Sequence, residues 1–452
     1  MSSSGHVVTS RGIERYRLQP GGALRGAVQV PGDKSISHRA LMLGGIAEGD
    51  TAVEGFLASE DCLATLSALQ ALGVAIERPQ RERVIVHGAG ARGLSSAAGP
   101  LDMGNAGTAM RLSMGLLAGQ PFDSTLIGDA SLMRRPMERA AVPLRLMGAR
   151  ILTQDGRPPV RILGGSALEG IDYELPVPSA QVKSAILLAS LKARGRTSIT
   201  EPAPTRDHSE RMLAAFGVEL TRSGRTVSLE GGQRLRGTHV EVPGDFSSAA
   251  FFLVAGCLAG DGLTLRNVGV NPTRTGLLEL LREMGADIRA HPLRGDARAS
   301  SGAEPVADLE VRAGPLRGIE VREALVPLAI DEFPVFFIAA ACAQGETVVR
   351  HAEELRVKES DRLAVMAEGL GKLGVEHELL PDGIRIRGSG ELGGGTVDSH
   401  GDHRIAMAFA VASLKARAPI EVLDVANVAT SFPGFVELAR AAGIRIEALG
   451  SE

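Results

Sequence analysis

Cysteine is scarce in this chain. The 452 residues contain three cysteines, Cys62, Cys257 and Cys342, which lie among apolar or small residues and form no CxxC pair. An odd number without such a pair excludes a disulfide framework and a zinc cluster built on cysteine. We therefore expect a protein of the reducing cytosol.

An excess of positive charge and long apolar runs are also lacking. The net charge is -4 at pH 7, so the surface offers no general basic field, and nucleic acid is not an expected partner. The longest apolar runs, such as residues 333–343, reach about half of the ~20 residues that a membrane span needs, so no membrane association is predicted. Residues 1–15 lack the apolar core of a signal peptide, and we predict a disordered tail there.

Common nucleotide and metal motifs are lacking as well. Neither GxxxxGKS nor GxxxxGKT occurs, which argues against a Walker-type nucleotide site. GAGARG (88–93) has the GxGxxG spacing, but LSSAAGP follows it where a dinucleotide site needs a helix, so we predict a turn. HGDH (400–403) contains metal-ligand residue types, yet it fits a helix start and has no evident partner cluster. No metal site is predicted.

A unit of about 70 residues is repeated along the chain. Six glycines each follow a helix-like stretch and precede a short strand-like one, as in ALGVAI and LMGARI: Gly73, Gly148, Gly217, Gly285, Gly374 and Gly443. In phase with them, six apolar helices rich in small residues each follow a polar loop, and a β-like run follows most of them. The unit is therefore helix, strand, helix, glycine C-cap and strand.

This repeat predicts an α/β architecture. Six copies of the unit fall naturally into two domains of three, with the boundary near VPGD (242–245). The longest spacing contains residues 291–311, which are rich in Gly, Ala, Ser and charge, and we predict a surface insertion there. A cleft between two such domains is a usual place for a ligand.

Lysine and arginine recur where the predicted helices begin. In PGDKSISHRALMLGG (31–45), Lys34 and Arg39 lie at a helix start, where a cation costs about 0.3–1 kcal/mol unless an anion offsets it. Four more cations repeat the pattern near other predicted helix starts: Arg356, Lys358, Arg362 and Arg404. A solvated surface charge is the simpler alternative for any one of them. Their recurrence predicts helix N-termini that converge on a shared anion.

Glycine and a further arginine pair accompany these cations. In GNAGTAMR, Gly107 would let backbone amides approach a ligand closely, although a plain loop explains the same letters. Arg134 and Arg135 precede Pro136, which suits the first position of a helix, so this pair is also predicted at a helix start. Guanidinium groups bind phosphate and carboxylate in a bidentate manner.

Acidic residues stand beside the cations. Asp331 and Glu332 open a predicted helix, where plain N-capping would explain them. Glu359 lies between Lys358 and Arg362, and an (i, i+3) Glu–Arg pair on a helix face would explain it. The alternative is that these three carboxylates are acid or base candidates among residues that bind anions.

Six segments taken together resemble the motifs of the 5-enolpyruvylshikimate-3-phosphate synthase family: PGDKSISHR, GNAGTAMR, SAQVKSA, TRDHSER, LRVKESDR and GDHRIAMAF. They occur in the family's order, and the resemblance runs over residues 18–445. It implies an inside-out α/β barrel fold of two domains, each built of three βαβαββ repeats. The expected domains are residues 28–241, and residues 16–27 together with 242–452.

The resemblance also implies a reaction. The enolpyruvyl group of phosphoenolpyruvate would be transferred to the 5-hydroxyl of shikimate 3-phosphate, through a tetrahedral intermediate and with release of phosphate. Neither a metal nor an organic cofactor is implied. These two substrates are the expected partners of a cytoplasmic monomer.

By motif position, the resemblance implies three sets of site residues. Those expected to hold shikimate 3-phosphate are Lys34, Ser35, Arg39, Ser179, Gln181, Arg206, Asp331 and Lys358. Those expected to hold phosphoenolpyruvate are Lys34, Gly107, Arg135, Gln181, Arg362 and Arg404. Those expected to act in catalysis are Asp331, Glu359 and Lys34. Thr430 departs from the family, because many members have lysine there as a contact with phosphoenolpyruvate.

Two alternatives stay open. UDP-N-acetylglucosamine enolpyruvyl transferase shares the fold and the donor, but its catalytic cysteine precedes an Arg-Pro in the loop that matches GDASLMRRP. This chain has no cysteine between Cys62 and Cys257. The other alternative is a repeat protein that binds phosphorylated metabolites as a sensor, without turnover.

Overall fold

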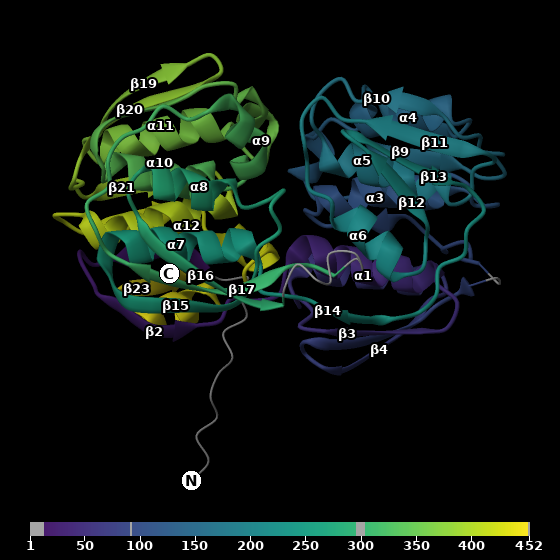
Figure 1. The fold of residues 1–452 in the computed structure, drawn as a ribbon, viewed down its shortest axis with the longest axis horizontal. Helices are drawn as coiled ribbons and strands as arrows, with labels where there is room; N and C mark the ends of the chain where they lie inside the picture. Colours follow the sequence, from purple (N-terminus) through teal and green to yellow (C-terminus); the bar gives the residue numbers. More distant parts are fainter. Residues whose placement is uncertain (1–12, 91–92, 295–302, 451–452) are drawn as a thin grey trace, which may run out of the picture.

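Two separate hydrophobic cores organise the chain. The computed structural model describes residues 13–90, 93–294 and 303–450. One core draws on residues 36–242, which we call the first lobe. The other draws on residues 16–30 and 246–446, which we call the second lobe. Figure 1 shows the second lobe on the left and the first lobe on the right.

Three apolar helices fill the interior of each lobe, while sheets lie outside them (Figure 1). In the first lobe these helices are α1 (Lys34–Ile46), α3 (Gly107–Leu117) and α5 (Ala180–Ser190). In the second lobe they are α7 (Phe246–Ala259), α10 (Phe333–Ala341) and α12 (His403–Ala412). All residues of α10 are buried, as expected of a helix that is apolar on every side. The fold is an inside-out α/β arrangement, as predicted.

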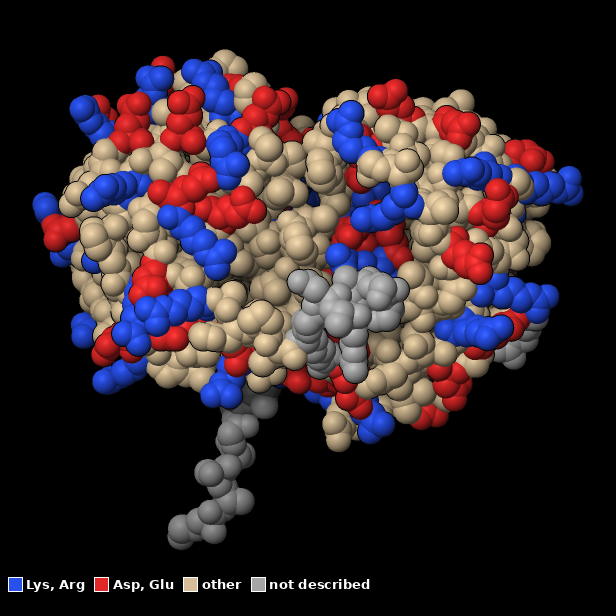
Figure 2. Space-filling view, in the orientation of Figure 1, with Lys and Arg blue, Asp and Glu red and all other residues tan. Residues whose placement is uncertain are grey.

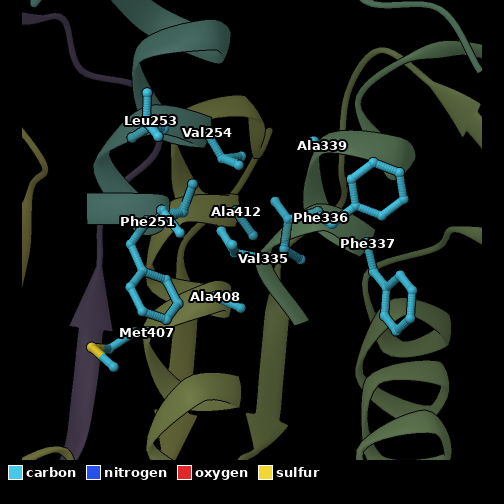
Figure 3. Packing of buried hydrophobic residues seen from close by; sticks show 14 of the residues in the cluster. Phe251, Leu253, Val254, Val335, Phe336, Phe337, Ala339, Met407, Ala408 and Ala412 are labelled. Carbon is cyan, nitrogen blue, oxygen red and sulfur yellow. The ribbon is translucent and has the colours of Figure 1, made fainter. Parts of the chain in front are cut away.

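Small residues allow these central helices to approach one another. Figure 3 shows α7, α10 and α12 packed side by side, with Ala408 and Ala412 of α12 next to larger side chains such as Phe251 and Val335. All four of these side chains are buried. Alternation of small and large side chains gives the close packing typical of protein interiors.

A second set of helices completes the repeat: α2 (Glu60–Ala71), α4 (Glu138–Leu146), α6 (His208–Ala215), α8 (Gly276–Glu283), α11 (Arg362–Lys372) and α13 (Phe435–Ala442). Each is followed, directly or one residue later, by one of the six glycines found in the sequence, and all six glycines have positive φ, between 77° and 116°. Side chains other than glycine rarely adopt this conformation, so glycine ends each helix before the next strand. The predicted C-caps are confirmed.

Three four-stranded sheets cover the first lobe. In spatial order their strands are β14 (His239–Glu241), β3 (Asp50–Glu54), β5 (Arg83–His87), β4 (Ala75–Gln80); β6 (Leu101–Asp102), β7 (Ser124–Ile127), β9 (Arg157–Leu163), β8 (Arg150–Gln154); and β10 (Asp172–Glu174), β11 (Arg196–Thr200), β13 (Thr226–Glu230), β12 (Leu220–Ser223). Chain order from β6 to β9 is β6, α3, β7, α4, β8, β9, which is the predicted βαβαββ repeat.

The sheets of the second lobe include strands from both ends of the chain. In spatial order they are β16 (Asp287–Arg294), β17 (Val306–Arg312), β15 (Gly260–Gly269), β2 (Leu24–Val28); β18 (Gln344–Val349), β20 (Gly383–Ser389), β19 (Glu376–Leu380); and β21 (Gly395–Asp398), β22 (Ile420–Leu423), β1 (Ile13–Leu18), β23 (Ile446–Gly450). Strand β1 thus lies between two strands from the last part of the chain.

The chain crosses between the lobes in two neighbouring segments, near residues 31–33 and 243–245. The amide of Asp33 donates to the carbonyl of Pro243, and the amide of Asp245 donates to the carbonyl of Pro31, each at 2.8 Å. The predicted domain division at residues 28 and 242 stays a prediction, and we propose that the two lobes are those domains.

Two predictions about irregular segments are wrong in part. Residues 13–15, assigned to a disordered tail, begin strand β1; residues 1–12 lie outside the described residues. Both ends of the predicted insertion at 291–311 belong to β16 and β17, which pair with each other, and residues 295–302 lie outside the described residues. The alternating pattern of VADLEV buries Leu309 and Val311 against the core. This alternation overrides the loop-like composition of the segment.

Three further features of the sequence can be compared with the structure. All three cysteines are buried free thiols. In GAGARG the amide of Gly93 donates to the carbonyl of Gly90 at 3.1 Å, and residues 91–92 lie outside the described residues. Within the described ranges no single helix is long and apolar enough to cross a membrane. Two consecutive helical segments, Glu323–Ala329 and Phe333–Ala341, are together long and apolar enough, but the chain bends by 119° between them.

Candidate functional site

A cavity of about 370 Å³ lies where the two lobes meet. The first residues of α1, α3 and α5 from the first lobe and of α7 and α12 from the second contribute to its wall. Helix N-termini present free amide groups and a positive dipole end, so this convergence favours an anionic ligand. Because the helices come from both lobes, the cavity depends on how the lobes are aligned.

Most of the predicted site residues line this cavity: Lys34, Ser35, Arg135, Ser179, Gln181, Arg206, Asp331, Lys358, Glu359 and Arg404. The other three, Arg39, Gly107 and Arg362, lie behind the wall. The side chains of Arg39 and Arg362 are 3% and 1% exposed, and Gly107 lies behind the guanidinium groups of Arg111 and Arg135. The structure therefore brings together the residues that the sequence places more than 300 positions apart.

Lys34 has an anionic partner within the protein. Its ammonium group forms an ion pair with Asp61 of α2, and its backbone amide donates to Asp245 at 3.0 Å. Asp33 caps α1 by accepting from the amide of Ile36 at 2.9 Å. Burial raises the pKa of Asp61, and the nearby Lys34 opposes that rise. The expectation that Lys34 needs a ligand anion was incomplete, since Asp61 already offsets its charge.

Arg39 is held in a buried network beneath the cavity. Its Nε donates to Ser209 at 2.7 Å, and its Nη2 donates to Ser184 at 2.8 Å and to Gln181 at 3.3 Å. Gln181 in turn donates to Thr108 at 2.9 Å. Burial lowers the pKa of Arg39 to about 10, although the carboxylate of Glu210 opposes the change, so the guanidinium stays charged at neutral pH.

The carboxylate of Glu359 forms ion pairs with cations of both lobes. Arg135 of the first lobe and Arg362 of the second each contact its carboxylate at 2.6 Å. Burial by itself raises the pKa of Glu359, but these two arginines outweigh burial and hold the pKa well below its usual range. Arg362 also contacts Asp402 at 2.8 Å. The (i, i+3) pair expected as an alternative explanation therefore exists, and it is part of a larger charged cluster.

Asp331 is surrounded by cations instead of capping a helix. Helix α10 begins at Phe333, and the Asp331 carboxylate forms ion pairs with Arg206 of the first lobe, Lys358 at 3.5 Å and Arg362 at 3.6 Å. Burial lowers the pKa of Lys358 to about 7, and the neighbouring Arg362 and Arg206 add to this effect. Plain N-capping, the alternative for Asp331, is therefore wrong.

Arg404 lies next to this acidic group. Its Nη1 donates to the backbone carbonyl of Asp331 at 2.9 Å and to Glu332 at 3.4 Å. The N-cap of α12 is Asp402, which accepts from the amide of Arg404 at 2.9 Å, as HGDH predicted. Burial lowers the pKa of His403 to about 3, so its imidazole is neutral at neutral pH. No group of three or more metal-ligand side chains occurs among the described residues.

Two predicted cation positions differ in the structure. Helix α4 begins at Glu138, so Pro136 precedes its N-cap by one residue, and Arg134 ends a short 3-10 helix with its side chain exposed. Arg356 donates to Asp361 at 2.7 Å and to two backbone carbonyls, which gives it a structural role outside the cavity wall. The simpler alternative of a solvated charge therefore holds for Arg134, whereas Arg356 is neither a solvated charge nor a residue of the cavity wall.

Sequence reasoning missed other residues of the wall, among them Arg111, Arg139, Asp245, Arg274, Glu354 and His403. Arg111 follows Gly107 by one helical turn, so the spacing gave a signal for it. Asp245 stands in GDF much as Asp33 stands in GDK, and both cap a central helix. Ser431 also lines the cavity, while Thr430 turns its hydroxyl to the carbonyl of Asn427 at 2.7 Å.

Known proteins resemble this chain over nearly its whole length. A sequence profile of the family described as EPSP synthase (3-phosphoshikimate 1-carboxyvinyltransferase) matches residues 18–438. The 3-phosphoshikimate 1-carboxyvinyltransferase of Alkalilimnicola ehrlichii is 62% identical over 433 residues, which cover 95% of this chain and 96% of the relative. That of Methylococcus capsulatus is 60% identical over 434 residues, with 96% and 98% covered. The solved structure of EPSP synthase from Acinetobacter baumannii has a TM-score of 0.85 and 51% identity, covering 96% of this chain and 100% of that one.

Proposed function

The chain belongs to the EPSP synthase family, and from this premise we propose how its residues carry out the family's reaction. The protein transfers the carboxyvinyl group of phosphoenolpyruvate to the 5-hydroxyl of shikimate 3-phosphate and releases phosphate. This reaction is a step of the shikimate pathway toward aromatic amino acids. The observation that carries the proposed roles is the cavity between the lobes, where cations of both lobes surround Asp331 and Glu359. The UDP-sugar transferase and the sensor are not favoured.

The two substrates would occupy different groups of cations. Each carries a phosphate and a carboxylate, which suit guanidinium and ammonium groups. Shikimate 3-phosphate is assigned to the N-termini of α1 and α5, with Arg206 and Lys358 on the wall and Arg39 behind it. Phosphoenolpyruvate is assigned to Arg135, Arg362 and Arg404. Lys34 and Gln181 line the same cavity and are assigned to both substrates.

The proposed chemistry is an addition followed by an elimination. A proton is added to the methylene carbon of phosphoenolpyruvate, and the 5-hydroxyl attacks the adjacent carbon while its proton passes to Asp331. The tetrahedral intermediate then loses a proton from the new methyl group, and the bond to phosphate breaks. Arginines of the cavity stabilise the charge that develops on the leaving phosphate, and closed lobes exclude water from the cationic carbon.

Glu359 and Lys34 are the proposed groups for the proton at the methylene carbon. In the structure Glu359 is paired with Arg135 and Arg362, which keep it ionised. The phosphate and carboxylate of bound phosphoenolpyruvate bring negative charge to the same arginines. A like charge nearby raises the pKa of a carboxyl group, so binding of the donor favours the protonated form of Glu359, which can give its proton to the methylene carbon.

The reaction is tested by measuring phosphate release. Purified protein with phosphoenolpyruvate and shikimate 3-phosphate, without added metal, is expected to release phosphate, and omission of either substrate is expected to stop it. The same assay with UDP-N-acetylglucosamine as acceptor separates the two transferases. Release only with the UDP-sugar, or with neither acceptor, would overturn the proposed function.

Gly107→Ala is expected to weaken binding of the donor. A Cβ on Gly107 would lie 2.5 Å from Nη1 of Arg135 and 2.9 Å from Nη1 of Arg111, so the guanidinium group of Arg135 must shift from its place in the cavity wall. We expect the KM for phosphoenolpyruvate to rise about tenfold, as for one lost charge-assisted hydrogen bond, with a smaller change for shikimate 3-phosphate. Steady-state kinetics check this result. Gly314→Ala is the control, because a Cβ there meets no described atom within 4 Å; an unchanged KM for the donor in Gly107→Ala contradicts the prediction.

Binding of shikimate 3-phosphate is expected to depend on pH through Lys358, whose pKa burial lowers to about 7. The ammonium form binds an anion, so affinity is present below this pKa and is lost as the pH rises through it. The Kd should therefore increase from pH ~7 to ~9, by at most about tenfold per pH unit, in a range where the ligand's phosphate is already a dianion. Calorimetry on wild type and Lys358→Met checks this. If the Kd of shikimate 3-phosphate still rises with pH in Lys358→Met, another group causes the pH dependence and the prediction is wrong.

A further inference from the structure

The start of α6 joins the first lobe to the second through buried polar groups. Nδ2 of Asn271 donates to Asp207 at 2.7 Å and to Glu304 at 2.9 Å. Nδ1 of His208 donates to Glu304 at 2.7 Å. Asp207 and His208 belong to the first lobe, and Asn271 and Glu304 to the second. We call these four residues the interlobe junction.

The interlobe junction lies at the groove between the lobes. Figure 1 shows α6 next to α1 in the first lobe, and Figure 2 shows acidic and basic side chains on the surface near it. Asp207, His208 and Asn271 are nevertheless at most 3% exposed, and the side chain of Glu304 is 9% exposed. The contact is therefore an internal one, shielded from water.

Asp207 departs from the usual use of its position. It is the N-cap residue of α6, where an aspartate normally accepts a hydrogen bond from the first turn of its helix. Among the described residues its side chain accepts no such bond. It accepts from Asn271 across the junction and from Nε of Arg211 at 2.9 Å. The carboxylate of Asp207 is thus shared between a side-chain ion pair on α6 and a hydrogen bond to the other lobe.

The residues on either side of Asp207 and His208 lead to the cavity. Ser209 accepts from Nε of Arg39 at 2.7 Å, and Ser209 also donates to Ser184, which accepts from the same guanidinium. Arg206 directly precedes Asp207 and forms its ion pair with Asp331 of the second lobe. A shift of the first turn of α6 would therefore move the partner of Arg39 and the backbone of Arg206 together.

Stability alone is a weak reason for this junction. Buried ionic groups lose hydration, and apolar residues of similar size would stabilise the folded state as well or better. Nε2 of His208 is buried and has no hydrogen-bond partner among the described residues. Burial by itself raises the pKa of Glu304, but His208 and Asn271 hold the pKa below its usual value, so the carboxylate stays ionised. The hydrogen bonds of the junction form, however, only when the two lobes have one particular position relative to each other.

We propose that the interlobe junction positions the acceptor site: it fixes the first turn of α6, so that Arg39 and Arg206 are held for shikimate 3-phosphate only when the lobes are aligned. Asp207, His208, Asn271 and Glu304 are then positioning residues that do not touch the substrate. This inference rests on the proposed function, because shikimate 3-phosphate is taken as the acceptor. The residues assigned to phosphoenolpyruvate lie outside α6, so the junction should affect the acceptor more than the donor.

Glu304→Gln tests the junction with little change of shape. We expect the Kd of shikimate 3-phosphate, measured by calorimetry, to rise about tenfold, in the range of coupling between contacting residues. Its KM should rise in parallel, while the KM for phosphoenolpyruvate at saturating acceptor stays within about twofold. Adding His208→Asn to Glu304→Gln should have little further effect, since the two residues act as one unit.

The control is Asp50→Asn, which removes the carboxylate partner of His87 at 2.8 Å on the exposed surface of the first lobe. It should leave both KM values unchanged. Equal binding of shikimate 3-phosphate by wild type and Glu304→Gln, or an equal rise of both KM values, would overturn the inference while leaving the proposed function intact. Wild type that fails to bind shikimate 3-phosphate would overturn both. If Glu304→Gln does not fold, Asn271→Ala is measured in its place against the same criteria.

Discussion

Asp331→Ala is expected to lower kcat by about 10³-fold, within the range for loss of a general base. The carboxylate forms ion pairs with Arg206, Lys358 and Arg362 in the cavity, and it is the proposed acceptor of the proton from the attacking hydroxyl. Without it the attacking hydroxyl has no base of this kind. The three cations remain, so the Kd of shikimate 3-phosphate is expected to change by less than about tenfold. Single-turnover kinetics and calorimetry measure the two effects separately.

Two further variants make the Asp331 result specific. Asp331→Asn keeps the size of the side chain and should be nearly as slow as Asp331→Ala, because an amide is not a base. Asp287→Ala removes an aspartate that is 49% exposed and paired with Arg289 in the same lobe, and should leave kcat unchanged. Wild-type turnover in Asp331→Asn would remove the proposed role of this carboxylate.

Glu359→Gln is expected to lower kcat by about 10²-fold or more, as for loss of a general acid. The change also frees Arg135 and Arg362 from a carboxylate that each contacts at 2.6 Å. Binding of phosphoenolpyruvate is therefore expected to be unchanged or tighter, although turnover falls. Protonation of the methylene carbon can be followed directly, as deuterium that enters this carbon from heavy water.

The control for Glu359 is Glu368→Gln on α11, where a glutamate that is 50% exposed pairs with Lys372. It should leave both turnover and deuterium entry unchanged. In the competing assignment, Lys34 donates the proton to the methylene carbon. In that case Lys34→Met stops deuterium entry, whereas Glu359→Gln lowers it by less than about tenfold, and the proposed role of Glu359 is then wrong.

The regular elements were predictable because local chemistry specifies them. The six glycines at helix ends need a left-handed conformation wherever the chain turns from helix to strand, so their spacing reveals the repeat. The apolar helices are buried on all sides and stand out by composition. The end of β16 and the start of β17 were missed, because residues 291–311 are rich in Gly, Ala, Ser and charge, a composition that is typical of a loop.

The site was predictable as a set of cations but not as a set of pairs. A cation at a helix N-terminus is locally unfavourable, which is visible in the sequence. Its partner depends on the folded arrangement: Asp61 reaches Lys34 from another helix, and Glu359 reaches Arg135 from the other lobe. The same is true of the interlobe junction, since TRDHSER shows its residue types but gives no indication of Asn271 or Glu304.

The place of β1 between β22 and β23 has a consequence for synthesis of the chain. The core of the first lobe is complete once residue 242 has left the ribosome, so this lobe can fold while translation continues. The second lobe needs residues 446–450 to flank the strand that was made first. Strand β1 thus leaves the ribosome long before β22 and β23, and until these two strands are made its backbone stays exposed to chaperones and proteases.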